Sequence, residues 1–208
     1  MAFTLADIKS AFYARGFDFL NDGSTGATRA LRFINDAMHL VDDMEAWQYL
    51  QASTTGTSPV TVSDLGRIES VTDVAHLNDL QYMPRANVTT LYGDLSLTSS
   101  VPTFYFVTGG NTVNTFPVSG VTLTVRYTKV APDLSADSDV PLMPDRFRMA
   151  IVHYAAQLAF AESNVPDEAQ LAGAAGDAVV ERMREWNLFV QGVDGGQQLV
   201  TPGLAGDW

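Results

Sequence analysis

The spacing of the apolar residues changes twice along the chain, and this change constrains the fold more than any other feature. Near both ends, apolar residues recur every three or four positions, which is the period of an amphipathic helix. In the middle the period is two, because Leu123, Val125 and Tyr127 alternate with polar residues, as in a strand with one buried face. This order of helices, strands and helices predicts an α+β fold.

Two helices are expected at the N-terminal end. Thr4 and Asp7 have the spacing of a capping box, which marks the start of the first helix. A turn-forming cluster, residues 21–26, is expected to end it, and a second helix is predicted from about Gly26 to Trp47. The apolar face of the first helix is expected to contain Leu5, Ile8, Phe12 and Phe19.

The middle of the chain is expected to be mainly β. Residues 51–60 contain few large apolar groups, so this stretch is interpreted as a linker. Short strands are predicted around residues 60–62 and 68–72, whereas residues 76–88 are ambiguous and could hold a helical turn. The run from Thr108 to Asn111 contains two glycines and predicts a hairpin turn between strands.

Two more helices are predicted after Pro144 and Pro166, since proline suits the first turn of a helix. Glycine inside a helix costs about 1 kcal/mol, which is tolerable where it lets a second helix approach closely. Small residues on both segments therefore predict a tight helical hairpin. The residues expected to pack there are Ala155, Ala156, Ala159, Gly173 and Gly176.

These elements predict a bundle of about four helices with a mainly β domain inserted between helices two and three. The expected parts are N-terminal helices over residues 1–52, a β domain over 53–130 and a helical hairpin over 131–190. An extended C-terminal arm is expected over residues 191–208.

Composition excludes several classes of function. The chain has 208 residues, no cysteine and a formal net charge of −12 with a pI near 4.4. Disulfides, thiolate metal sites and cysteine nucleophiles are therefore excluded. The acidity disfavours ordinary nucleic-acid binding, yet it suits a surface past which nucleic acid slides without sticking. Neither a membrane span nor a signal peptide is expected.

No residue pattern predicts catalysis or a bound cofactor. His39, His76 and His153 lie in different segments, and we interpret His39 and His153 as ordinary helix residues rather than metal-binding or catalytic ones. Four aspartates between residues 133 and 145 lack the spacing of a calcium loop, which favours capping roles. The chain also lacks the common phosphate-binding, zinc-protease and serine-hydrolase motifs. We therefore expect no enzyme, no metal and no cofactor.

The C-terminal arm is rich in glycine yet retains large apolar residues. Such anchors are typical of a segment that becomes ordered on a partner, although they equally suit a terminus that packs on its own domain. The candidate docking residues are Leu199, Val200, Pro202, Leu204 and Trp208.

An ordered series of short patterns resembles the head-to-tail adaptor, or connector, proteins of tailed bacteriophages. The resemblance extends from Leu31 to Glu185 and departs from the family pattern between Ser53 and Ser100 and in the glycine-rich arm. It begins with a helix that ends in acidic residues and a tryptophan, within residues 32–50. The later matching positions are Pro102, Tyr105, Gly109, Phe116-Pro117, Tyr127, Pro132-Asp133-Leu134 and residues 139–144, which lead into an alanine-rich helix.

The resemblance implies a non-enzymatic structural protein of the virion neck, made in the bacterial cytoplasm. It implies a ring, commonly of twelve copies, that binds the portal protein on one side and tail or neck proteins on the other. Genomic DNA would pass through its bore without sequence-specific binding. Three alternatives stay open. The first is another neck or tail-completion protein, such as a stopper or terminator. The second is a carbohydrate- or ligand-binding β module that uses Phe104, Tyr105, Phe106 and Tyr127 as a platform, and the third is an enzyme built around His39 or His153.

Overall fold

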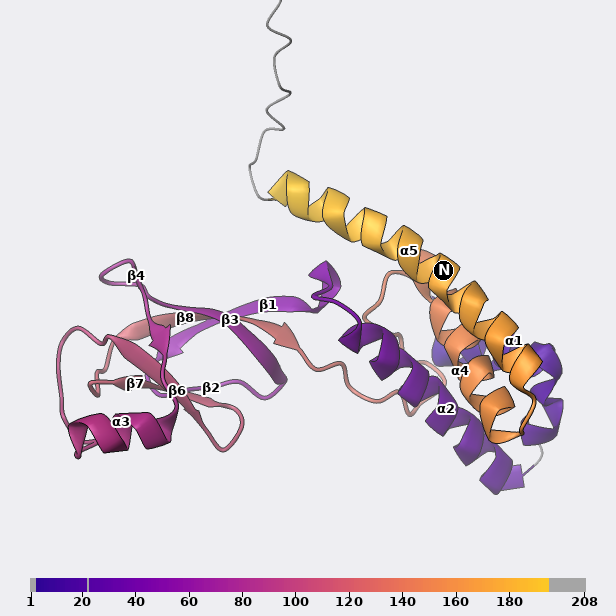
Figure 1. Ribbon diagram of the computed structural model, residues 1–208, viewed down its shortest axis with the longest axis horizontal. Helices are drawn as coiled ribbons and strands as arrows, with labels where there is room; N and C mark the ends of the chain where they lie inside the picture. Colours follow the sequence, from indigo (N-terminus) through magenta and orange to yellow (C-terminus); the bar gives the residue numbers. More distant parts are fainter. Residues whose placement is uncertain (1–2, 22, 195–208) are drawn as a thin grey trace, which may run out of the picture. The chain divides into compact units, whose positions relative to one another are not determined.

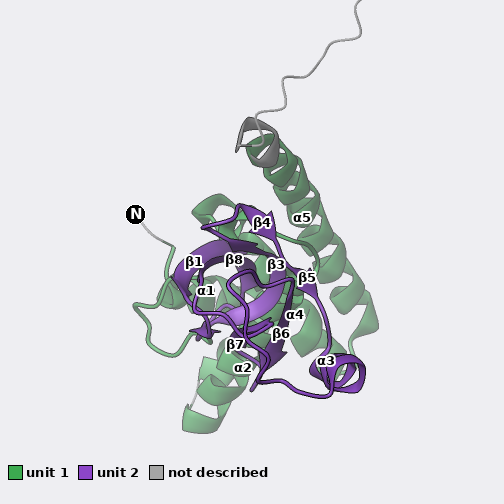
Figure 2. Cartoon of the chain, turned by 90° about the vertical axis from the view of Figure 1, so that its left-hand side faces the viewer, with its two compact units in different colours: residues 1–49, 133–208 green, residues 50–132 purple. Residues whose placement is uncertain are grey.

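The computed structural model describes residues 3–21 and 23–194. It confirms an α+β fold and divides the chain into two compact units, which Figure 2 shows in different colours. The helical unit comprises residues 1–49 and 133–208, and the β unit comprises residues 50–132. The β unit is thus a single stretch of chain inserted into the helical unit.

The helical unit is built around α4 (Met149–Glu162), which packs against α1 (Leu5–Phe12), α2 (Gly23–Asp43) and α5 (Pro166–Asp194) (Figure 1). This central position explains why α4 buries residues around most of its circumference, including Ile151, Val152 and Tyr154. No helix within the described ranges is long and apolar enough to cross a membrane.

The N-terminal helices differ in detail from the sequence prediction. The capping box is confirmed, because the backbone N–H of Thr4 donates to the Asp7 carboxylate over 2.8 Å. Phe19 was wrongly assigned to the apolar face, since it is 60% exposed. The helix ends earlier, in a π-helical turn (Tyr13–Phe17) where Gly16 has a φ of +97°, and a 3₁₀ turn (Asp18–Asn21) follows. This break turns Phe17 inward instead of Phe19.

The second helix, α2, begins at Gly23 and ends at Asp43, so both predicted bounds were wrong by a few residues. Trp47 lies beyond the helix and is fully buried, and its indole N–H donates to the carbonyl of Val41 over 2.7 Å. The tryptophan thus closes the end of α2 by donating a second hydrogen bond to a carbonyl of its last turn, which also accepts one from the backbone N–H of Met44.

The β unit is a sandwich of two four-stranded sheets. The first has the order β1 (Gln51–Thr57), β8 (Thr122–Lys129), β3 (Leu65–Asp73) and β4 (Asn78–Asp79). The second has the order β2 (Val60–Thr61), β7 (Thr112–Phe116), β6 (Phe104–Thr108) and β5 (Gln81–Tyr82). All pairs are antiparallel except β5 with β6.

The core of the β unit lies between the two sheets. It includes Val71, Leu123, Val125 and Tyr127 from the first sheet and Tyr105 and Val113 from the second. The alternation that predicted β8 is thereby confirmed, and so is the hairpin turn, in which Gly109 and Gly110 both have positive φ values between β6 and β7.

For two stretches of the β unit, the structure corrects one sequence interpretation and resolves another. Residues 51–60 are not a linker, because Gln51–Thr57 pair with β8 as an edge strand. The threonines suit the pleated sheet although they supply no apolar alternation. The ambiguous stretch, residues 76–88, contains β4 and β5 and does hold a helical turn, because α3 (Arg85–Tyr92) begins within it. Val88 of α3 packs with Phe106 and Phe116 on the outer face of the second sheet.

Candidate functional site: polar joints and packing surfaces

The three histidines lie apart and each has its own neighbour. His39 Nε2 lies 2.7 Å from an oxygen of Asp133, and His76 Nδ1 lies 2.6 Å from an oxygen of Asp73. His153 Nε2 lies 3.4 Å from the guanidinium of Arg15, and burial together with that positive charge lowers the pKa of His153. Among the described residues, no group of three or more His, Cys, Asp or Glu side chains is placed to hold a metal ion.

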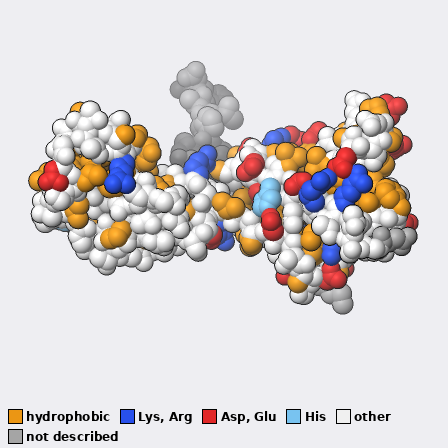
Figure 3. Space-filling view, turned by 90° about the horizontal axis from the view of Figure 1, so that it is seen from below, with side chains coloured by type: hydrophobic (Ala, Val, Ile, Leu, Met, Phe, Trp, Pro, Cys, Tyr) orange, Lys and Arg blue, Asp and Glu red, His pale blue; other side chains and the backbone are white. Residues whose placement is uncertain are grey.

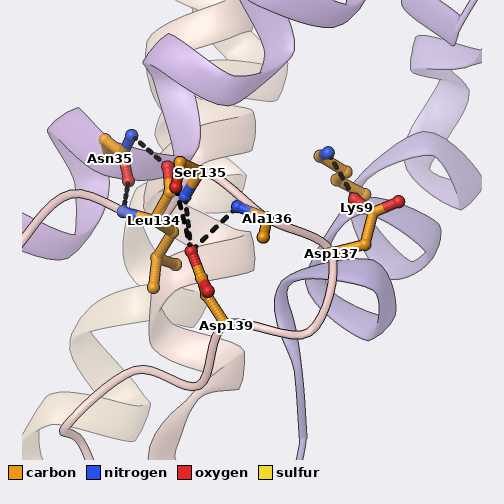
Figure 4. A network of polar contacts seen from close by, with 7 residues as sticks. All are labelled: Lys9, Asn35, Leu134, Ser135, Ala136, Asp137 and Asp139. Atoms are coloured by element: carbon orange, nitrogen blue, oxygen red, sulfur yellow. Dashed lines mark hydrogen bonds and ion pairs between the residues drawn. The ribbon is translucent and has the colours of Figure 1, made fainter.

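The aspartates of the segment between the β unit and α4 each contact a different group instead of converging. Asp139 accepts hydrogen bonds from the backbone N–H groups of Ser135 and Ala136, both over 2.8 Å (Figure 4). Asp137 forms an ion pair with Lys9 over 2.7 Å. The carboxylates therefore fold and anchor this crossover segment, residues 133–144, in agreement with a capping role.

The crossover segment is also joined to the first two helices. The side-chain amide of Asn35 on α2 donates to the carbonyl of Leu134 over 3.1 Å and accepts from its N–H over 3.0 Å (Figure 4). The backbone N–H groups of Leu5 and Ala6 donate to the carbonyls of Asp139 and Asp137. Since these N–H groups have no partner inside α1, the crossover segment caps that helix.

Arg148 is the central polar residue of this joint, and no sequence pattern indicated it. Arg148 is 5% exposed, and its guanidinium donates to the carbonyls of Met143, Phe3 and Pro141 over 2.8, 2.6 and 2.8 Å, while Asp145 supplies a carboxylate partner. Burial lowers the pKa of Arg148, and Asp145 acts in the opposite direction. The fork of donors therefore fixes the N-terminus, the crossover segment and the start of α4 together.

A second polar pair lies at the end of α2. The Tyr49 hydroxyl donates to Asp42 over 2.5 Å, and the other carboxylate oxygen of Asp42 is buried without a hydrogen-bond partner among the described residues. Burial raises the pKa of Asp42 to about 6, although the hydrogen bond from Tyr49 opposes this shift. This carboxylate is poised to take up a proton, and the charges of His39 and Asp43 also act on it, the first lowering and the second raising its pKa.

The predicted packing residues of the last two helices lie as follows. Ala155, Ala156 and Ala159 are buried on α4. A Cβ atom at Gly176 would lie 2.9 Å from two ring atoms of Tyr154, and one at Gly173 would lie 2.8 Å from the amide end of Gln157. Tyr154 is held in place because its hydroxyl donates to Asp177 over 2.6 Å. Both glycines therefore lie where α5 approaches α4 closely.

The C-terminal end of α5 carries exposed apolar side chains. Leu188 is 69% exposed and Phe189 is 71% exposed, and they immediately precede the predicted arm. The helix itself continues to Asp194, so the first residues of the predicted arm are helical. The candidate docking residues Leu199, Val200, Pro202, Leu204 and Trp208 lie outside the described residues.

The acidity belongs almost wholly to the helical unit. The β unit contains four Lys or Arg and five Asp or Glu, which gives a net charge of −1. The helical unit contains the other eight Lys or Arg and the other nineteen Asp or Glu, which gives a net charge of −11. In Figure 3, charged side chains accordingly gather over the helical unit in the right-hand part of the view, whereas the β unit at the left displays few.

The aromatic strand residues do not form an exposed platform. Tyr105, Phe106 and Tyr127 are each less than 9% exposed, and Phe104 is partly buried against the cluster beneath α3. A flat sugar-binding surface needs exposed ring faces, so the carbohydrate-platform interpretation of these four residues was wrong.

The polar groups of this α+β protein thus join its segments, and the end of α5 carries the exposed apolar side chains Leu188 and Phe189. A family model for the SU10 adaptor protein matches residues 4–194, which is nearly the whole chain. The chain therefore belongs to the SU10 adaptor protein family and is a phage adaptor-type structural protein. A search of curated proteins finds no match.

Membership of an adaptor family implies interaction with other phage head or tail proteins and oligomerization, and it suggests a component of the virion. Such families are typically non-enzymatic, which agrees with a polar network devoted to joining segments.

Proposed function

We propose that this protein is a head-to-tail adaptor that forms a ring beneath the portal and bridges the DNA-filled capsid to the tail. The observation that carries the proposal is the family match over residues 4–194. The twelve copies, the portal as partner and the neck as location rest on the resemblance to head-to-tail connector proteins. In this proposal the helical unit builds the ring, and residues 50–132 form an inserted domain on its outside or tail side.

The C-terminal arm is proposed to dock on the portal. Leu188 and Phe189 support this proposal, because exposed leucine and phenylalanine at the end of α5 lead directly to the apolar anchors from Leu199 to Trp208. An arm that orders only on its partner loses conformational entropy at that step, which makes ring assembly follow portal binding.

The charge distribution supports passage of DNA through the bore. A helical unit with a net charge of −11 repels phosphate, so a bore lined by its acids would release exiting DNA instead of holding it. Replacing exposed acidic residues of α5 by their neutral amides tests whether these acids line the bore. The expected result is slower ejection at low salt, and unchanged ejection would count against it. The acids for that variant are Asp167, Glu168, Glu181 and Glu185.

Electron microscopy of the purified chain mixed with the portal protein of the same phage tests the proposal. Rings stacked on the portal are expected. Rings that bind only tail components would favour a stopper or terminator, and a chain that never binds either partner would refute the adaptor function.

A further inference from the structure

The tip of the hairpin between β3 and β4 displays an unusual leucine. Leu77 is 85% exposed, the largest exposed fraction among the large apolar side chains described. Its φ is +50°, in the left-handed region that bulky L-residues rarely adopt. A strained backbone that projects an apolar side chain into solvent contributes nothing to the core of its own unit, and such strain is typical of functional positions.

The hairpin tip is held in this conformation by polar contacts of the buried Asp73 side chain and by one at the base of the tip. Asp73, which is 0% exposed, accepts a hydrogen bond from the backbone N–H of Ala75 over 3.0 Å and contacts His76 Nδ1 over 2.6 Å. At the base of the tip, the hydroxyl of Thr72 donates to Asp79 over 2.6 Å. Leu77 is therefore presented by a fixed turn, which lowers the entropy lost when it inserts into a partner.

A hollow of about 350 Å³ lies on the other side of the β unit. Phe106, Thr108 and Asn114 from β6 and β7 contribute to it on the outer face of the second sheet, which is the face that α3 covers. The hairpin tip belongs instead to the first sheet, and Figure 1 shows β4 and α3 at opposite sides of the sandwich. The apolar part of the hollow consists of Pro59, Leu95, Phe106 and Val118.

We propose that Leu77 of one copy inserts into this hollow on the β unit of the next copy in the ring. The inference rests on the proposed function, because it names the contact between neighbouring β units. A projection and a recess on opposite sides of one unit form a heterologous contact, which repeats from copy to copy and closes where the rotation allows.

The charges of the two units favour a second copy as the occupant. Neighbouring β units, each with a net charge of −1, repel one another little, so a contact between copies at this unit supports the ring that the helical units build. Direct contact between β units therefore gives the ring an interface at which like-charge repulsion is small.

Disulfide trapping tests the contact directly, because the chain has no cysteine of its own. Leu77→Cys is combined with Val118→Cys, or with Leu95→Cys as a second position in the hollow, in the full chain mixed with the portal protein. Oxidation is expected to give a ladder of covalent multimers on a non-reducing gel, and each single variant is expected to stay monomeric. Rings on the portal without a ladder from either pair would overturn this contact and leave the adaptor function intact, whereas absence of rings before oxidation would overturn both.

Leu77→Asn separates docking from folding. Asparagine adopts the left-handed conformation more readily than leucine, so the thermal midpoint is expected to stay level or rise. Ring formation is expected to fall roughly tenfold or more, as for the loss of a central interface anchor. Leu91→Asn is the matched control, because Leu91 is 66% exposed on α3 and has no place in the proposed contact. Normal assembly by Leu77→Asn, or an equal defect in Leu91→Asn, would contradict the proposal.

Discussion

The two glycines of α5 are expected to respond in opposite ways to the same substitution. Replacing glycine by alanine inside a helix gains about 1 kcal/mol of helix propensity. Gly176→Ala also places a methyl group 2.9 Å from Cε2 and Cζ of Tyr154. That ring is 3% exposed and its hydroxyl is bonded to Asp177, so it has little freedom to move.

The cost of overpacking and the gain in helix propensity together decide whether each substitution stabilises or destabilises the protein. Overpacking of a fixed core side chain costs about 1–3 kcal/mol, so Gly176→Ala is expected to lose about 1 kcal/mol net. In Gly173→Ala the nearest atoms, at 2.8–3.1 Å, belong to the flexible amide end of Gln157, which rotates away at little cost. The propensity gain then prevails, and stability is expected to rise by about 0.5–1 kcal/mol.

Thermal unfolding followed by circular dichroism at 222 nm measures both variants. For a chain of this length 1 kcal/mol shifts the midpoint by about 2–4 °C, so the two variants are expected to move in opposite directions by a few degrees. If both variants were stabilised, the close contact with Tyr154 would not limit packing. If both were destabilised to the same extent, the distinction between a fixed ring and a flexible amide would be refuted.

Three further predictions concern the polar joints and the end of α5. Arg148→Met removes the partner of three backbone carbonyls and is expected to cost about 3 kcal/mol or more in urea unfolding, whereas Arg182→Met on an exposed face is expected to change stability by less than about 0.5 kcal/mol. Because burial raises the pKa of Asp42 from 3.8 to about 6, the folded state binds a proton more tightly than the unfolded chain. The native chain is therefore expected to lose up to about 2 kcal/mol relative to Asp42→Asn as the pH rises from about 4 to about 6, and parallel stability curves for the two proteins would contradict this. Replacing Leu188 and Phe189 together by serine is expected to leave the midpoint within about 2 °C, since both are exposed, while weakening portal binding; unchanged binding would remove this part of α5 from the docking surface.

The elements that the sequence indicated correctly are those whose periodicity is local. The alternation in β8 and the double glycine of the hairpin between β6 and β7, Gly109-Gly110, each follow from a few neighbouring residues. The edge strand β1 lacks such a signal, because its threonines and serine form a strand only through pairing with β8, about seventy positions later in the chain.

The polar joints could be predicted only in part for a related reason. The aspartates of the crossover segment suggested capping, but their partners on α1 and α2 are distant in sequence. Arg148 gave no signal at all, because its three acceptors are backbone carbonyls, which every residue supplies. The exposed position of Leu77 could not be predicted from the sequence either, since its exposure and positive φ depend on how Asp73 folds the hairpin tip.

The adaptor function is tested most directly by imaging the purified chain mixed with the portal protein of the same phage. Rings of this chain are expected to stack coaxially on the portal, and the same rings are expected on portals that carry no tail. A chain that remains unbound at concentrations where the portal is intact would contradict the adaptor function.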